Sequence, residues 1–75
     1  MTKEDFLLEL EDILQTDDPI EIDLQLEDLE EWDSLAMMAV MSYYKKNFGI
    51  NVTLKELKEI KSPADLIALA GDKIK

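Results

Sequence analysis

The sequence predicts an all-α domain in which four helices form a bundle and a long ordered loop joins the first helix to the second. Three observations predict this fold class. Apolar residues recur at spacings of three and four in several stretches, which is the period of a helix with one buried face. Residue types that cap helices stand before those stretches. The chain has 75 residues, which allows one domain, residues 1–75, with a small core.

The first helix is expected over about residues 3–15. Thr2 is the expected N-cap, and Asp5 follows three residues later, where a carboxylate suits the first turn. The Asp-Asp-Pro sequence at 17–19 is expected to end the helix, because proline lacks an amide hydrogen and disfavours helical geometry in the residue before it. The expected buried face consists of Phe6, Leu7, Leu10, Ile13 and Leu14.

Residues 16–32 are expected to form a loop that is long for so small a domain. Such connections are usually functional or held down by side chains, and apolar residues are frequent here. We therefore expect an ordered loop, with one short helical turn near residues 26–30. The residues expected to anchor it are Ile20, Ile22, Leu24, Leu26, Leu29 and Trp32.

The second helix is expected over residues 34–48, with Asp33 as its N-cap and Gly49 as the left-handed residue that ends it. Its spacing leaves Leu35 and Met38 near the rim of the buried face. The expected inward stripe consists of Met37, Val40, Met41, Tyr44 and Phe48.

Two shorter helices complete the predicted bundle. Thr53 and Glu56 form a capping box before a third helix over about residues 54–59, after a short extended piece at 50–52. Ser62, followed by proline at the first helical position and Asp65 at the third, begins the last helix. Gly71 is expected to weaken the final turn. The residues expected to close the core are Leu66, Ile67, Leu69, Ala70 and Ile74.

The charge is strongly negative and unevenly distributed. Eighteen acidic and eight basic side chains give a net charge of −10. Residues 1–33 hold 14 of the acids and one lysine, so the division falls at Ser34. A chain of this charge repels nucleic acid and favours partners with basic protein surfaces. We therefore expect protein partners and no nucleic acid, and we expect a monomer.

The composition excludes several kinds of chemistry. The chain has no cysteine and no histidine, which excludes disulfides, thiolate nucleophiles, imidazole bases and the usual zinc sites. The acids at 17–23 lack the glycine and the spacing of a calcium loop. Glu30, Glu31 and Asp33 crowd together without a partner residue that suggests a catalytic pocket, so we expect a solvated acidic edge. We expect no metal site, no catalytic residue and no enzymatic activity.

No membrane insertion is expected from the sequence. The first residues lack the basic and then apolar pattern of a signal peptide. The longest apolar run, residues 35–41, is far shorter than the ~20 residues needed to span a bilayer. The cytoplasm is the expected location.

The triplet Asp33-Ser34-Leu35 is the most informative local feature of the chain. Taken alone, it indicates only a helix cap. Here it stands between an acidic segment and a helix that ends at Phe48-Gly49, with a short third helix and a capped fourth helix following. With this joint pattern, the chain resembles the acyl and peptidyl carrier proteins over nearly its whole length. The segment Glu31-Trp32-Asp33-Ser34-Leu35-Ala36 is similar to the variant of the family motif found in specialised carriers.

The resemblance implies a four-helix bundle of the acyl-carrier type and a function in fatty-acid, polyketide or related biosynthesis. It implies that Ser34, flanked by Asp33 and Leu35, receives 4′-phosphopantetheine from coenzyme A. The chain would then carry an acyl, hydroxyacyl or aminoacyl group as a thioester. Because no histidine can take the serine proton, a separate phosphopantetheinyl transferase is the expected partner, followed by loading and transfer enzymes.

The chain departs from the carriers of primary fatty-acid synthesis along the second helix. Those carriers show acidic side chains there, whereas residues 34–48 contain none and include Lys45 and Lys46. We therefore expect a dedicated carrier in a specialised pathway. The residues expected to contact its partners are Leu35, Met38, Glu30, Glu31 and Lys45.

Several alternatives remain open at the level of sequence. The alternative to a carrier is a small helical adaptor protein in which Asp33 and Ser34 only cap a helix. The three methionines of the second helix are either flexible core filler or the lining of a space for an acyl chain, in which Tyr43 and Tyr44 add bulk. Trp32 either anchors the loop or contacts the phosphopantetheine arm.

Overall fold

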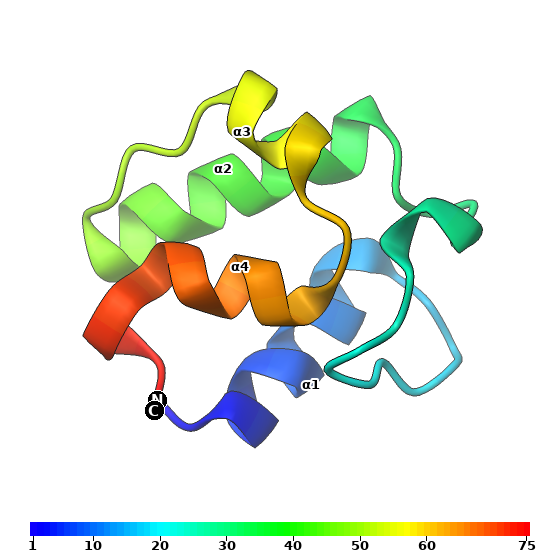
Figure 1. Cartoon of the computed structure of the whole chain (residues 1–75), viewed down its shortest axis with the longest axis horizontal. Coiled ribbons are helices and arrows are strands. Elements are labelled where there is room, and N and C mark those ends of the chain that lie inside the picture. Colours follow the sequence, from blue (N-terminus) through cyan, green and yellow to red (C-terminus); the bar gives the residue numbers. More distant parts are fainter.

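The computed structural model of residues 1–75 is all-helical, as the sequence predicts (Figure 1). The helices pack around one apolar core, and the two chain ends meet, since the amide of Lys75 donates to the carbonyl oxygen of Met1 at 2.7 Å. The four α-helices are α1 (Lys3–Leu14), α2 (Ser34–Phe48), α3 (Leu54–Glu59) and α4 (Pro63–Ala70), with 3-10 turns at Leu26–Asp28 and Gly71–Lys73.

Helix α1 begins as predicted and ends one residue early. The Thr2 hydroxyl accepts a hydrogen bond from the amide of Asp5 at 3.1 Å. The helix ends at Leu14 because Gln15 adopts the left-handed conformation, with a φ of 55°. The prediction that the Asp-Asp-Pro sequence ends the helix is therefore wrong, since the backbone has already left the helix four residues before Pro19.

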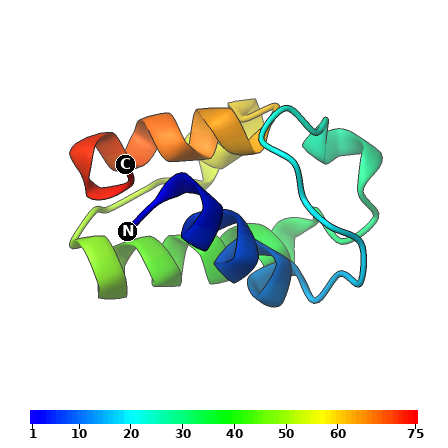
Figure 2. The ribbon, with the colours of Figure 1, turned by 90° about the horizontal axis from the view of Figure 1, so that it is seen from below.

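The loop between α1 and α2 is ordered by backbone hydrogen bonds as well as by side chains. The amide of Leu26 donates to the Lys61 carbonyl at 2.9 Å, and the amide of Ala64 donates to the Ile22 carbonyl at 3.0 Å. These bonds hold the loop against the beginning of α4 (Figure 2). The predicted helical turn is present as the 3-10 turn Leu26–Asp28.

The apolar anchors of this loop are mostly as predicted, with one exception. Ile20 and Leu26 are buried, and Leu24, Leu29 and Trp32 are half-buried against the core. The prediction is wrong for Ile22, whose side chain is 39% exposed. Its backbone carbonyl makes the connection to α4, so this residue holds the loop without burying its side chain.

Helix α2 has the predicted bounds and caps. The Asp33 carboxylate accepts a hydrogen bond from the amide of Ala36 at 2.9 Å, and Gly49 ends the helix with a φ of 69°. The predicted inward stripe is confirmed at Val40 and Tyr44, but it omits Ala36. The fully buried face is Ala36, Val40 and Tyr44, spaced at four, while the predicted stripe residues Met37, Met41 and Phe48 are half-buried beside it.

The C-terminal end of α2 packs into a cluster of aromatic rings. Tyr44 lies between Phe6 of α1 and Phe48, with ring centroids at 6.1 Å and 5.1 Å and near-perpendicular ring planes. The Tyr44 hydroxyl donates to the Leu66 carbonyl of α4. Burial raises the pKa of this hydroxyl, and the neighbouring Tyr43 raises it further. Aromatic rings thus fill the core at the C-terminal end of α2, and aliphatic side chains form most of the rest of it.

Helices α3 and α4 are short, and the predicted cap bonds are present at the start of α3 but not at the start of α4. The capping box of α3 is complete, since Thr53 and Glu56 each accept from the other's backbone amide. At α4 the predicted cap residue Ser62 makes no side-chain cap bond, and the Asp65 carboxylate instead accepts from the amide of Lys61 at 3.1 Å. The last turn changes to a 3-10 turn at Gly71. Of the residues expected to close the core, Leu66, Ile67, Ala70 and Ile74 are buried, and Leu69 is half-buried.

Candidate functional site

Ser34 lies at the first position of α2 and is exposed to solvent. The segment before it is shaped by two tight turns, in which the amide of Trp32 donates to the Leu29 carbonyl at 3.1 Å and the amide of Asp33 donates to the Glu31 carbonyl at 3.0 Å. Asp33 supplies the cap bond to the helix, so the Ser34 hydroxyl is not needed for capping. The first amides of a helix have no partner within it, so Ser34 stands beside free donors at the positive end of the helix dipole.

The other hydroxyl side chains are placed differently. The hydroxyls of Thr2 and Thr53 accept cap bonds from backbone amides, and that of Thr16 accepts from the amide of Asp18. Ser62 is half-buried at the N-cap of α4, and Ser42 is exposed in the middle of α2. Among these side chains, Ser34 alone combines exposure with a position in the first turn of a helix.

Two large apolar side chains follow Ser34 on the outward face of α2. Leu35 is 74% exposed and Met38 is 51% exposed. Both therefore lie where the sequence predicted them, outside the buried face. The far end of this face carries Lys45 and Lys46, which are exposed in the last turn. The outward face of α2 is therefore apolar near Ser34, at Leu35 and Met38, and positively charged at its C-terminal end, at Lys45 and Lys46.

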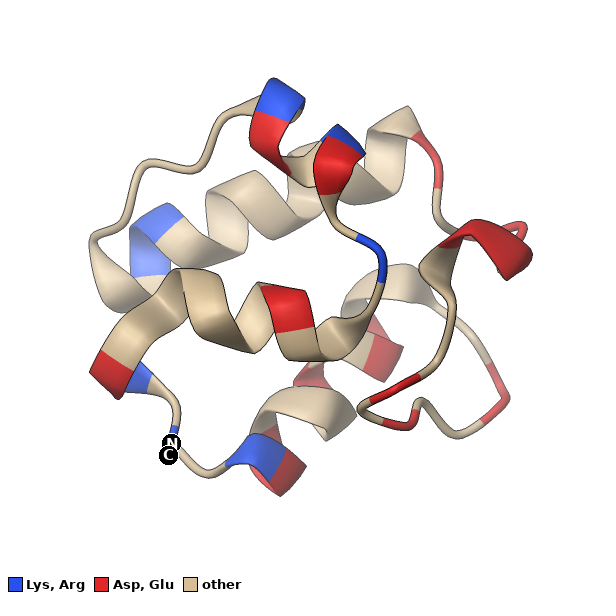
Figure 3. Cartoon of the chain, in the orientation of Figure 1, with Lys and Arg blue, Asp and Glu red and all other residues tan.

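The acidic side chains surround this helix without lying on it. Figure 3 shows them on α1, on the loop, on the turn before α2 and on α3 and α4, whereas α2 itself carries only blue positions at its C-terminal end. Glu30 is exposed and Glu31 is half-buried in the turn just before Ser34. The acidic residues that are close to Ser34 in the sequence therefore all lie on its N-terminal side.

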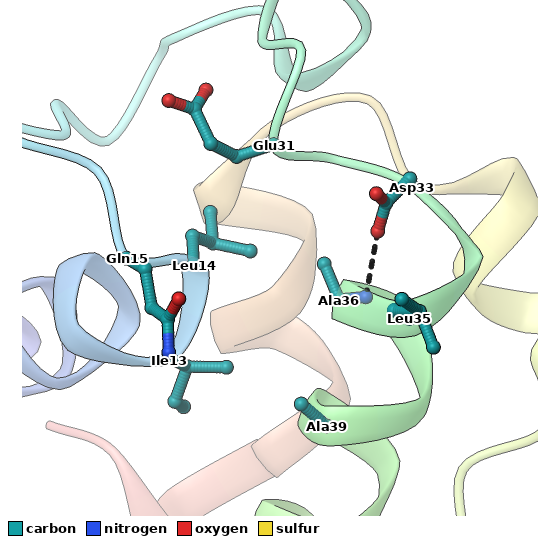
Figure 4. A pocket seen from close by; sticks show the side chains of 8 residues that line it. All are labelled: Ile13, Leu14, Gln15, Glu31, Asp33, Leu35, Ala36 and Ala39. Carbon is teal, nitrogen blue, oxygen red and sulfur yellow. Dashed lines mark hydrogen bonds between the residues drawn. The ribbon is translucent and has the colours of Figure 1, made fainter.

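A groove of about 410 Å³ runs between the end of α1 and the beginning of α2. Figure 4 shows the side chains of Ile13 and Leu14 directed from α1 toward α2, and the methyl groups of Ala36 and Ala39 facing them. The remaining lining residues are Gln15, Glu31, Asp33 and Leu35. Asp33 and Leu35 are the two neighbours of Ser34, so the groove opens beside the serine.

A second hollow, of about 520 Å³, lies on the α3 side of the same end of α2. Trp32 and Met37 line it together with two lysines, Lys58 and Lys61, and two glutamates, Glu27 and Glu59. The hollow therefore carries charges of both signs, whereas the charged side chains of the first groove are both acidic. Trp32 is half-buried and packs against the core, as expected for a loop anchor, and it also lines this hollow. No group of three or more acidic side chains is placed to hold a metal ion.

The sequence-predicted site residues are brought together only in part. Asp33, Ser34 and Leu35 form the start of α2, and Glu30, Glu31 and Met38 lie in the turn before it or in its first two turns. Lys45 lies at the opposite end of the helix. The sequence does not mark Gln15 or the α1 side chains as site residues, because no local pattern shows that the end of α1 faces the start of α2.

Residues 5–70 match the family model described as phosphopantetheine attachment site. The chain belongs to this family. The carrier therefore bears 4′-phosphopantetheine covalently and, like domains of this family, is not itself a catalyst. Its partners include a phosphopantetheinyl transferase and enzymes of biosynthesis.

No curated protein and no solved structure matches the carrier significantly. The family assignment therefore rests on the family model alone, which spans all four helices. None of these helices has the length and apolar character that crossing a membrane requires.

Proposed function

We propose that Ser34 is the attachment residue and that residues 1–75 act as one carrier domain in a specialised biosynthetic pathway. Its cargo is an acyl, hydroxyacyl or aminoacyl group held as a thioester. The observation that carries this proposal is the placement of Ser34, exposed at the first position of α2, while Asp33 makes the cap bond.

The start of α2 suits a phosphodiester on Ser34. Unpaired amides and the helix dipole favour an anion at this position by about 0.3–1 kcal/mol. The side chains that flank the hydroxyl, Asp33 and Leu35, are both exposed, so they leave it accessible. When bound, the group supplies the terminal thiol that this cysteine-free chain lacks.

Ser34 acts in this proposal as a substrate residue of another enzyme. A serine hydroxyl is a weak nucleophile unless a base takes its proton, and the chain contains no histidine. The carboxylate next to it, that of Asp33, already accepts the amide of Ala36 through one oxygen. The transferase therefore supplies the base, and the carrier supplies an accessible hydroxyl.

Partner enzymes bind the surface around Ser34 through apolar contacts, through acidic side chains and through one lysine. Leu35 and Met38 offer exposed apolar side chains on α2, and Glu30 and Glu31 offer negative charge on the turn before it. Lys45, at the far end of α2, contacts the part of the partner that lies beyond the apolar patch.

The charge of α2 supports a dedicated pathway rather than primary fatty-acid synthesis. This helix has no acidic residue between Ser34 and Phe48, so a partner that recognises a row of acids along the helix finds none. A panel of purified elongation, loading and transfer enzymes tests this part of the proposal. Preferred turnover by ordinary fatty-acid elongation enzymes would contradict it.

Mass spectrometry tests the attachment residue directly. After incubation with coenzyme A, magnesium and a broad-specificity phosphopantetheinyl transferase, we expect one phosphopantetheine per chain, located on Ser34. The variant Ser34→Ala should remain unmodified, and Ser42→Ala, which removes another exposed hydroxyl of α2, should be modified like the wild type. A modified Ser34→Ala chain, or an unmodified wild-type chain, would refute the proposal.

A further inference from the structure

We propose that a groove at Lys45, beside the C-terminal half of α2, binds a carboxylate side chain of an enzyme that loads or unloads the phosphopantetheine arm. The partner therefore has an acidic surface where it meets this end of the helix. This inference rests on the proposed function, because it names the chemistry of a partner that also reaches Ser34. The lining of the groove, its place on α2 and the local charge carry the argument.

The lining of this Lys45 groove supplies hydrogen-bond donors and no carboxylate. The groove has a volume of about 290 Å³ and lies between α2 and the segment that leads to α3. Its polar lining residues, Ser42, Lys45 and Asn51, are all exposed. Its apolar lining residues are Met41 and Val52, and Val52 is 6% exposed, so it forms the floor. A hydroxyl, an ammonium and an amide NH2 group around one space suit a carboxylate.

The polar groups of the Lys45 groove are available to a ligand. The side chains of α2 and its cap that make hydrogen bonds are Asp33, Tyr43, Tyr44 and Asn47. None of these four residues lines the groove. The ammonium of Lys45 carries three donors on a flexible stem, so it can turn toward a carboxylate held over the groove. A partner's carboxylate would thus replace water there without breaking a hydrogen bond within the carrier.

The Lys45 groove lies on the same face of α2 as the proposed attachment residue. The residues of one stripe along the helix, spaced at four, four and three, are Ser34, Met38, Ser42 and Lys45. At 1.5 Å per residue, Lys45 lies about 16 Å beyond Ser34 along the helix axis. A protein interface of standard size covers about 800 Å² on each partner, which is a patch about 30 Å across. An enzyme that covers Ser34 and the exposed Met38 side chain therefore reaches the groove.

The local charge distinguishes this stretch from the rest of the chain. Residues 34–55 contain three lysines and no acid, although the whole chain has a net charge of −10. Figure 3 shows two of these lysines as the blue positions at the C-terminal end of α2. The acid that precedes the stretch, Asp33, lies about 14 Å from Ser42 along the axis. Glu56, which follows the stretch, turns its carboxylate to the amide and hydroxyl of Thr53. The groove is thus a local exception in an acidic protein.

A structural role of Lys45 must be separated from binding, because a lysine in the last turn also stabilises a helix through the helix dipole. Lys46 provides the matched control. It is exposed in the same turn, about 100° further round the helix, and does not line the groove. Lys45→Glu and Lys46→Glu each place a negative charge at the same helix end. Both should lower the melting temperature by a similar amount, which circular dichroism measures.

A binding measurement tests the Lys45 groove without any enzyme. In an NMR titration of the unmodified chain, N-acetylglutamic acid α-amide should shift the backbone amide signals of Ser42, Lys45 and Asn51. N-acetylglutamine amide, the neutral isostere, should produce much smaller shifts. The shifts should be lost in Lys45→Glu and kept in Lys46→Glu. Equal shifts from the two amides, or an equal loss in the two variants, would overturn this inference.

Kinetics with a partner enzyme test the surface that meets the groove. The carrier and both variants are first converted to the phosphopantetheine form and then given to the loading or transfer enzyme that turns over the wild type fastest. Lys45→Glu should lower kcat/KM roughly tenfold through a higher KM, and Lys46→Glu should change it by less than about threefold. Added salt should narrow this difference, because it screens exposed charges.

Equal kcat/KM values for the two variants would also overturn this inference. A wild-type chain that accepts no phosphopantetheine would instead overturn the proposed function. In that case the titration with the two amides still decides whether the Lys45 groove prefers a carboxylate.

Discussion

The two ends of helix α2 differ in packing and in exposure, although they belong to one continuous helix. At the C-terminal end, Tyr44 is fully buried between aromatic rings and hydrogen-bonded to α4. At the N-terminal end, Ser34 and Leu35 are exposed, and small side chains at Ala36 and Ala39 leave a groove beside α1. One end stabilises the bundle, and the other presents the hydroxyl.

The contrast between the two ends explains how so small a domain can offer an accessible surface. A core of this size gives only a small free energy of unfolding. The residues at the start of α2 can remain exposed because contacts elsewhere stabilise the fold. The aromatic cluster at the opposite end supplies such contacts. The comparison predicts that substitutions in the aromatic cluster change stability and that substitutions at the exposed start of α2 change recognition.

The largest expected effect on stability follows from Tyr44→Ala. Removing a fully buried aromatic ring leaves a cavity, and the expected cost is about 3–5 kcal/mol in the free energy of unfolding. Urea denaturation followed by circular dichroism measures this cost. The folded fraction should still accept phosphopantetheine on Ser34. A loss of modification in chains that remain folded would contradict the prediction that the two ends of α2 have separate roles.

A smaller effect is expected from Tyr44→Phe, which keeps the ring and removes the hydrogen bond to the Leu66 carbonyl. The expected cost at neutral pH is about 1 kcal/mol. Burial raises the pKa of Tyr44 in the folded state, so the folded chain keeps a proton that the unfolded chain loses above a pH of about 10. Stability should therefore fall as the pH rises through and above 10.

Denaturation at several pH values checks this dependence. The fall in stability between about pH 9 and about pH 11 should be shallower in Tyr44→Phe than in the wild type, because the variant lacks this buried proton. Burial and the nearby Glu9 carboxylate also raise the pKa of Tyr43, so part of the fall should persist in the variant. Identical slopes would show that Tyr44 does not contribute.

The smallest expected effect on stability belongs to Leu35→Ala at the open end. Leu35 is 74% exposed, so the free energy of unfolding should change by less than about 0.5 kcal/mol. Its kcat/KM with the transferase should nevertheless fall roughly tenfold, because an exposed apolar side chain beside the reacting serine is an expected anchor for the enzyme. Leu8→Ala is the matched control, since Leu8 is 64% exposed on α1 and does not line the groove. Equal rates for the two variants would contradict the role of Leu35.

Features that depend on a few neighbouring residues could be predicted from the sequence. The capping box of Thr53 and Glu56, the cap bond of Asp33 and the left-handed Gly49 are all local, and all three are confirmed. The end of α1 could not be predicted, because Gln15, which is not a glycine, adopts the left-handed conformation, and Pro19 is the stronger signal in the sequence.

Features that depend on how helices meet could not be predicted in the same way. Ala36 is buried beside the groove between α1 and α2, whereas hydrophobic spacing alone favours the larger Met37. Ile22 holds the loop through its carbonyl, which side-chain patterns do not reveal. The sequence marked Ser34 and its flanking residues, but the groove combines residues of α1, the loop and α2, and only the fold brings them together.

The position of Trp32 has a practical consequence. It is the sole tryptophan of the chain, half-buried two residues before Ser34, and the polypeptide contains no cysteine. Once the arm is attached to Ser34, a maleimide dye would react at a single sulfur, and the indole would serve as a built-in fluorescence donor. Energy transfer between them would follow the swing of the arm during encounters with an enzyme, with no label engineered into the protein.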